Sequence, residues 1–145
     1  MNLFVTAGAV VIAFGYAFYI KAILAGNADL TEKSLMAAVA DWLAKNGVKS
    51  QPKVWFFYYL SLVFEAAYLY CAYRAFDNLA FQILTSAVIG VEAYTFSRLH
   101  QRIWQFFHGR ITLGDVFIWR AERISALALF THAMIVLLYP LASRL

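Results

Sequence analysis

The chain has 145 residues, of which 63% are hydrophobic and only 14% are charged, and its net charge is +4. An average soluble domain is roughly half apolar, so this composition excludes an ordinary soluble protein, while the length predicts a single domain over residues 1–145. The positive charge would suit nucleic acid, but the basic residues flank long apolar segments, which favours membrane orientation and contact with anionic lipid instead.

The first apolar segment, residues 3–24, is long enough to cross a bilayer as a helix. A cleaved signal peptide is the alternative interpretation. However, no basic residue precedes the apolar run, and the run exceeds the usual signal core of ~7–15 residues. We therefore expect a retained helix, whose many small residues allow close packing against other helices.

Residues 30–46 predict a short amphipathic helix on the membrane surface. Asp29 and Glu32 have capping-box spacing before it, and Gly47 is placed to end it. Its apolar side chains recur on one face at helical spacing: Leu35, Met36, Val39, Trp42 and Leu43. Such a helix lies at the interface or docks on a partner, and the sequence leaves both open.

Three further apolar segments, residues 54–76, 79–98 and 124–142, are each long enough to span the bilayer. Residues 99–123 predict cytoplasmic helical extensions of the third and fourth helices. Thr112 and Asp115, at capping-box spacing, mark the expected start of the fourth. The predicted fold class is all-α: a polytopic membrane protein with four transmembrane helices and one interfacial helix between the first and second.

Most of the 12 basic residues lie in two stretches, one between the first and second spans and one between the third and fourth. Loops rich in lysine and arginine stay in the cytoplasm. The pattern therefore predicts a multi-pass protein of the cell inner membrane, with both termini on the non-cytoplasmic side.

Three ionisable residues fall inside the predicted spans: Glu65, Glu92 and His132. An unpaired charge there costs at least ~2.5–3.5 kcal/mol, so such side chains usually face the interior of the helix bundle. Polar or small residues share their faces at helical spacing. The expected intramembrane polar site comprises Glu65, Glu92, His132, Ser61, Tyr68, Gln82 and Thr85.

Two carboxyl groups and an imidazole can relay protons, pass cations or hydrogen-bond a quinone. A structural role as neutral, hydrogen-bonded side chains is the alternative for each residue alone. No metal site is predicted, because the Glu-x-x-His pairs of di-metal bundles are missing from the sequence. No cofactor is predicted for the chain alone, although a quinone or a haem shared with a partner chain stays open.

Arginines of the second basic stretch alternate with aromatic residues and predict a cytoplasmic docking surface: Arg98, Arg102, Arg110, Arg120 and Arg123. Expected partners are the lipid bilayer, other membrane subunits or further copies of the chain, and an acidic cytoplasmic protein, but not nucleic acid. The leading hypothesis is a non-enzymatic subunit or scaffold of a larger membrane complex. The alternative is a small transporter, channel or redox anchor that uses Glu65, Glu92 and His132.

Overall fold

A computed structural model describes residues 3–142 of the chain, with side chains as far as residue 139. Every regular element in this range is helical, which confirms the all-α prediction. In chain order the elements are α1 Leu3–Leu24, α2 Ala28–Asn46, η1 Gly47–Lys49, α3 Ser50–Ala75, α4 Leu79–Phe107, η2 Leu113–Asp115 and α5 Trp119–Ala142, where η marks a short 3-10 helix.

By length and composition, four helical stretches of the described residues can cross a membrane: Leu3–Leu24, Ala28–Ala75, Leu79–Phe107 and Trp119–Tyr139. The second stretch joins α2, η1 and α3 without a long loop. At about 1.5 Å per residue, α3 alone, with its 26 residues, reaches about 39 Å. That exceeds the ~30 Å hydrocarbon layer, so α2 is not needed for the span.

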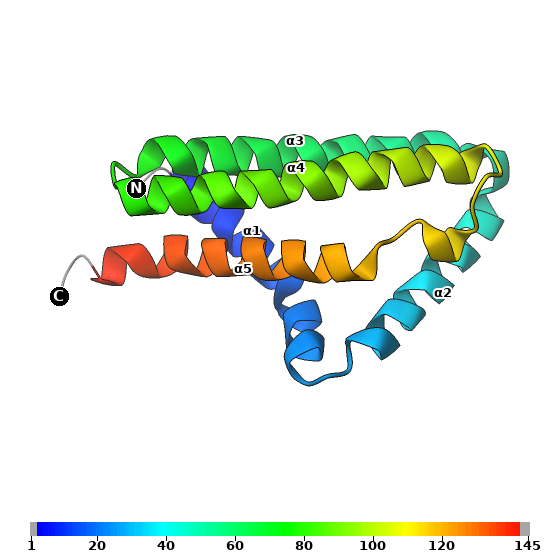
Figure 1. Ribbon diagram of the computed structural model, residues 1–145, viewed down its shortest axis with the longest axis horizontal. Coiled ribbons are helices and arrows are strands. Elements are labelled where there is room, and N and C mark those ends of the chain that lie inside the picture. The colour runs from blue at the N-terminus through cyan, green and yellow to red at the C-terminus, as the bar shows by residue number, and fades with distance from the viewer. Residues whose placement is uncertain (1–2, 143–145) are drawn as a thin grey trace.

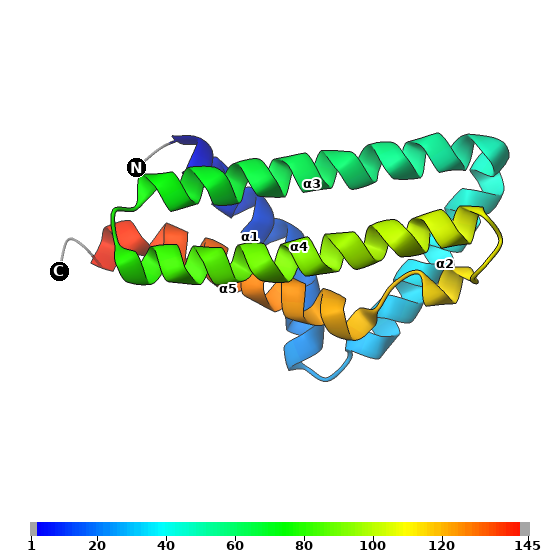
Figure 2. The same ribbon diagram turned by 45° about the horizontal axis from the view of Figure 1, so that its top comes forward.

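The long helices form a ring in which each contacts two neighbours: α1 with α5, α5 with α4, α4 with α3, and α3 with α1. Helices α3, α4 and α5 run side by side, while α1 crosses them obliquely (Figures 1 and 2). The start of α1 and the end of α5 lie at one end of the bundle, and α2 lies at the opposite end (Figure 1). We call the end near α2 and η2 the basic end.

Local signals set some of the helix ends, and two ends depart from expectation. Asn78 caps the start of α4, where its side chain accepts from the Phe81 N–H. Gly47 ends α2 as predicted, with φ 52° and its N–H donating to the Leu43 carbonyl. Asp29 and Glu32 do not cap α2, because Asn27 occupies the N-cap position without a side-chain cap bond. Their carboxylates are turned toward α5, where a guanidinium group offers a stronger partner than backbone N–H groups do.

The fourth helix also begins later than expected. Thr112 and Asp115 do form a capping box, but the helix that it starts is η2, which has three residues. α4 continues to Phe107 as expected, whereas α5 begins only at Trp119. Tertiary packing accompanies the difference: Val116, which follows η2, is buried with Tyr58 and Ile103 in the apolar cluster at the basic end.

The main apolar core lies between the four long helices and includes Val5, Tyr68, Leu129 and Val136, each of which is fully buried. Close approach of α1 to α3 depends on Gly8. A Cβ atom at that position would lie 2.8 Å from Cδ2 of Tyr68, which is nearer than carbon atoms pack. The small residues of α1 thus seat the tyrosine ring in the core.

Candidate functional site

Three glutamates meet inside the bundle around a cavity of about 170 Å³. Glu65 comes from α3, Glu92 from α4 and Glu122 from α5. We call these three residues the carboxyl cluster. Other polar side chains line the same cavity, so all four long helices contribute to it: Tyr16 of α1, Ser61 of α3, Thr95 of α4 and Ser125 of α5.

Within the carboxyl cluster, Glu92 is the most buried residue, with 5% of its surface exposed. Its two carboxyl oxygens lie 2.8 and 2.9 Å from Oγ of Ser125, which donates to them. The Glu65 side chain contacts that of Glu92, while Oε2 of Glu65 is buried without a hydrogen-bond partner in the described part of the chain. Two carboxyl groups can hydrogen-bond to each other only when one carries a proton, so this pair is suited to hold one.

No lysine or arginine neutralises the carboxyl cluster in the described residues. The ion pairs found there join Lys45 to Asp41 and Arg123 to both Asp29 and Glu32. An uncompensated carboxylate in an apolar interior is costly. The cluster can lower this cost by binding a proton or another cation.

The cluster does not have the arrangement of a resident metal site. Residues 3–142 contain no group of three or more His, Cys, Asp or Glu side chains placed to hold a metal ion. Proton exchange therefore fits the geometry better than coordination of a divalent ion.

His132 belongs to a second polar layer, with Tyr68 and Thr85. Nδ1 of His132 lies 3.0 Å from the Tyr68 hydroxyl, and Nε2 lies 2.9 Å from Oγ1 of Thr85. The Thr85 hydroxyl donates its one proton to the Phe81 carbonyl at 2.8 Å, so it can only accept from the imidazole. A neutral imidazole with its proton on Nε2, accepting from Tyr68 at Nδ1, satisfies all these bonds.

The two layers are separated along the bundle. Thr85 precedes Glu92 by seven residues on α4, and His132 follows Ser125 by seven residues on α5, which corresponds to about 10 Å in both helices. The structure therefore brings Glu65 and Glu92 together and places His132 apart from them, nearer to the chain ends.

The two remaining expected site residues are Gln82, which lies outside both layers, and Ser61, which lines the edge of the cavity of the carboxyl cluster. Nε2 of Gln82 donates to the Phe76 carbonyl at 3.4 Å, next to the turn between α3 and α4. Ser61 lies between the internal cavity and a second cavity of about 330 Å³ at the basic end, whose walls are mainly apolar and aromatic. Phe96 and Leu99 line the same two cavities, which are therefore direct neighbours.

Arg123 is engaged within the chain rather than free for docking. Its Nε and one terminal nitrogen donate to the two carboxyl oxygens of Glu32 at 2.7 and 2.8 Å, and it also contacts Asp29. The Tyr19 hydroxyl donates to Oε1 of Glu32 at 2.6 Å. This group joins α1, α2 and α5. It could not be predicted from local sequence patterns, because Arg123 lies 91 and 94 positions from the carboxylates that it binds.

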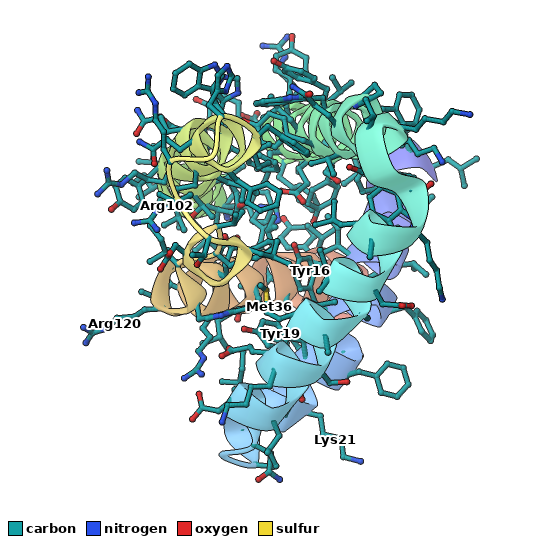
Figure 3. All side chains as sticks on the ribbon, turned by 90° about the vertical axis from the view of Figure 1, so that its right-hand side faces the viewer. Tyr16, Tyr19, Lys21, Met36, Arg102 and Arg120 are labelled. Atoms are coloured by element: carbon teal, nitrogen blue, oxygen red, sulfur yellow. The ribbon has the colours of Figure 1, made fainter. Side chains whose placement is uncertain are left out.

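The other arginines of the expected docking surface lie at the basic end. The guanidinium groups of Arg98 and Arg110 lie over the rings of Tyr94 and Trp104. Arg102 donates to the Asp115 carbonyl. Figure 3, which faces this end, shows Arg120 and Lys21 extending outward, whereas Tyr16, Tyr19 and Met36 lie toward the middle.

Asp115 illustrates the local electrostatics of the loop that follows α4. Its carboxylate accepts from the Thr112 hydroxyl at 2.7 Å and from the Thr112 backbone N–H at 3.2 Å. These two hydrogen bonds hold the pKa of Asp115 below its usual value.

Sequence reasoning missed Glu122, because a fourth span that starts at residue 124 leaves this glutamate in the cytoplasm. A signal was nevertheless present: Glu122, Ser125, Leu129 and His132 recur at three- and four-residue steps and therefore share one helix face. Tyr16 carried no comparable signal in an apolar helix.

No protein-family model, curated protein or solved structure matches this chain.

Proposed function

We propose that this chain is a small multi-pass membrane transporter whose carboxyl cluster takes up and releases protons inside the helix bundle. The observation that carries this proposal is the meeting of Glu65, Glu92 and Glu122, from three different helices, around one cavity without a basic partner in the described residues. Intramembrane carboxyl groups that face a bundle interior are the usual components of proton relays.

The two neighbouring cavities support proton access to the carboxyl cluster from the basic end. The apolar and aromatic cavity at the basic end shares Ser61, Phe96 and Leu99 with the cavity of the cluster, so protons need cross only this short boundary. On the other side of the cluster, the neutral layer of Tyr68, Thr85 and His132 and the apolar core beyond it fill the space between the four helices.

The basic end supports an orientation for the protein. Lysines and arginines near that end favour the cytoplasm, so in the proposed orientation the cluster is within reach of the cytoplasm and both termini lie outside an inner membrane. In this arrangement α2 lies along the interface. Single-cysteine labelling in a Cys71→Ser background tests the orientation: Lys49→Cys should react from the cytoplasmic side and Asp77→Cys from the opposite side. The reverse pattern would refute it.

Infrared difference spectroscopy between acidic and alkaline buffer tests proton exchange by the cluster directly. Wild-type protein should show carboxyl bands that respond to pH and exchange slowly in D₂O, because the groups are enclosed. Glu65→Gln and Glu92→Gln should remove these bands, whereas Asp41→Asn, which changes an exposed carboxylate, should leave them.

Two outcomes would contradict the proposal. Correctly folded Gln variants that keep the slow bands would show that other groups produce them. Variants that lose helix content and aggregate, while Glu65→Asp and Glu92→Asp fold, would assign the carboxyls a structural role.

A second candidate, the role of subunit or scaffold, is favoured by the exposed arginines at the basic end. Arg98, Arg110 and Arg120 have no carboxylate partner in the described part of the chain. Such a surface suits an acidic cytoplasmic protein or anionic lipid. Purification in mild detergent should then recover a partner, and the combined change of Arg98, Arg110 and Arg120 to Gln should release it while membrane insertion is unchanged. Unchanged recovery of the partner would refute this role.

A further inference from the structure

A long groove runs between α3 and α4 and leads to the carboxyl cluster. Its volume is about 590 Å³, within the range of ~300–1,000 Å³ that is typical of small-molecule sites. It extends from Leu62 to Arg74 on α3, which corresponds to about 18 Å. Since α3 and α4 are predicted to span the bilayer, the groove opens toward lipid.

The walls and the floor of this groove differ in chemistry. Apolar side chains and three aromatic rings, those of Tyr70, Tyr73 and Phe96, form the walls. Glu65 and Glu92 form part of the floor, and the same two residues line the internal cavity. Phe96 also lines both spaces, so the glutamate pair and this ring form the boundary between the groove and the interior of the bundle.

The charge distribution selects one class of occupant. An anion would meet two carboxyl groups, and a lipid tail would leave the buried Oε2 of Glu65 without a partner. A positive charge would be paired by the carboxyls and would lie among aromatic rings, whose faces attract cations. Among the described residues, Arg74 is the one basic side chain that lines the groove. It is nine residues or about 13 Å from Glu65 along α3, so it repels a cation only at the far end.

We propose that the groove between α3 and α4 binds a lipophilic organic cation, which enters sideways from the bilayer and places its charge against Glu65 and Glu92. This inference rests on the proposed function, because the cation takes the place of a proton held by the glutamate pair. One positive charge enters and one proton leaves toward the internal cavity, so the site stays at constant charge. The ionisable groups facing Glu65 from the other helices are Tyr16, Glu92 and Glu122, and none of them carries a positive charge.

Equilibrium dialysis of the full chain in nanodiscs, with radiolabelled tetraphenylphosphonium as the probe, tests the proposal. Saturable binding is expected, with about one proton released per cation bound and weaker binding as the pH falls. Tetraphenylborate, which has the same shape and the opposite charge, should not compete. Glu65→Gln should weaken binding at least tenfold and abolish the proton release.

A second variant blocks the groove without changing the carboxyl cluster. Its result is therefore informative even if Glu65→Gln does not fold. Ala66 lines the groove and is exposed on the surface of α3. Ala66→Trp should fill the groove and abolish tetraphenylphosphonium binding while leaving the slow carboxyl bands unchanged. The matched substitution Val63→Trp, at an exposed α3 position that does not line the groove, should bind as wild type does.

The outcomes distinguish the two proposals. Tetraphenylphosphonium binding that is absent, that is unaffected by Ala66→Trp, or that is matched by tetraphenylborate would overturn the groove proposal even if the carboxyl bands respond to pH. If the wild-type protein shows no carboxyl bands that respond to pH, the proposed function is overturned as well.

Discussion

The contact between α1 and α3 can be tested by enlarging one residue. In Gly8→Ala, the new Cβ would lie 2.8 Å from Cδ2 of the Tyr68 ring, at least half an ångström closer than ordinary carbon contact. The ring cannot move freely, because Tyr68 is fully buried and its hydroxyl bonds to His132 at 3.0 Å. Overpacking of this kind costs about 1–3 kcal/mol.

The matched control is Gly15→Ala on the same helix. Nothing lies within 4 Å of a Cβ at Gly15, so this change should be neutral or stabilising by up to about 1 kcal/mol, because alanine favours helix over glycine. SDS titration of the detergent-solubilised protein measures the free energy of unfolding of each variant. We expect Gly8→Ala to be less stable than Gly15→Ala by at least about 1 kcal/mol, the lower end of the overpacking cost.

A double variant tests the proposed reason for this loss. If the Tyr68 hydroxyl holds the ring in place, Tyr68→Phe should allow the ring to shift, and Gly8→Ala combined with Tyr68→Phe should lose less stability than the two single changes added together. Equal stabilities of Gly8→Ala and Gly15→Ala would refute the packing of α1 on α3 described here. Strict additivity would refute the role of the hydroxyl.

Three further changes probe other contacts. Thr85→Val should destabilise the protein by about 1 kcal/mol, the upper part of the range for hydrogen bonds in membranes, because it leaves the buried imidazole without an acceptor. Thr85→Ser keeps the hydroxyl and should leave the stability unchanged. Equal unfolding curves for the two variants would contradict the role of this hydrogen bond. Glu32→Gln should loosen α2 and speed its cleavage in limited proteolysis, whereas Asp41→Asn should not. The pKa of Asp115 is lower in the folded protein than in the unfolded chain, where an aspartate has a pKa of about 4. The capping box therefore contributes its full stability above about pH 4, and this contribution is lost as the pH falls through the folded pKa. An NMR titration should show the Asp115 midpoint rising toward its usual value in Thr112→Val.

The sequence was sufficient for the helices because their signals are local. Apolar runs of bilayer length, Gly47 after α2 and the polar turn before α4 all act within a few residues, and the observed helices begin and end close to the expected positions. The loop from 108 to 118 could not be predicted in the same way. Burial of Val116 against Tyr58 and Ile103 is a tertiary effect, and it prevails over the tendency of a capped segment to continue as a helix.

The functional side chains also differ in whether local sequence signals or only tertiary contacts reveal them. Glu65 and Glu92 were identified from the cost of charge in a membrane, which requires no knowledge of helix order. Glu122 was missed because the expected boundary of the fourth span fell two residues after it. Arg123 was assigned to a docking surface because a positive charge near the end of a transmembrane helix ordinarily has no partner within the protein. Its bidentate pairing with Glu32 became visible only when α2 was placed against α5.

The matched spacing of the two polar layers limits how the chain can work. Seven residues separate Thr85 from Glu92, and seven separate Ser125 from His132, so antiparallel α4 and α5 bring both layers into register at once. Sliding α5 by one helical turn, about 5.4 Å, would break the bonds of both layers without bringing the imidazole to the glutamates, which are about 10 Å away. His132 is therefore better suited to fix the register of α4 and α5 than to receive a proton from Glu92. Under the proposed function, a proton bound by the carboxyl cluster would leave most directly toward the basic end, through the cavity that borders Ser61.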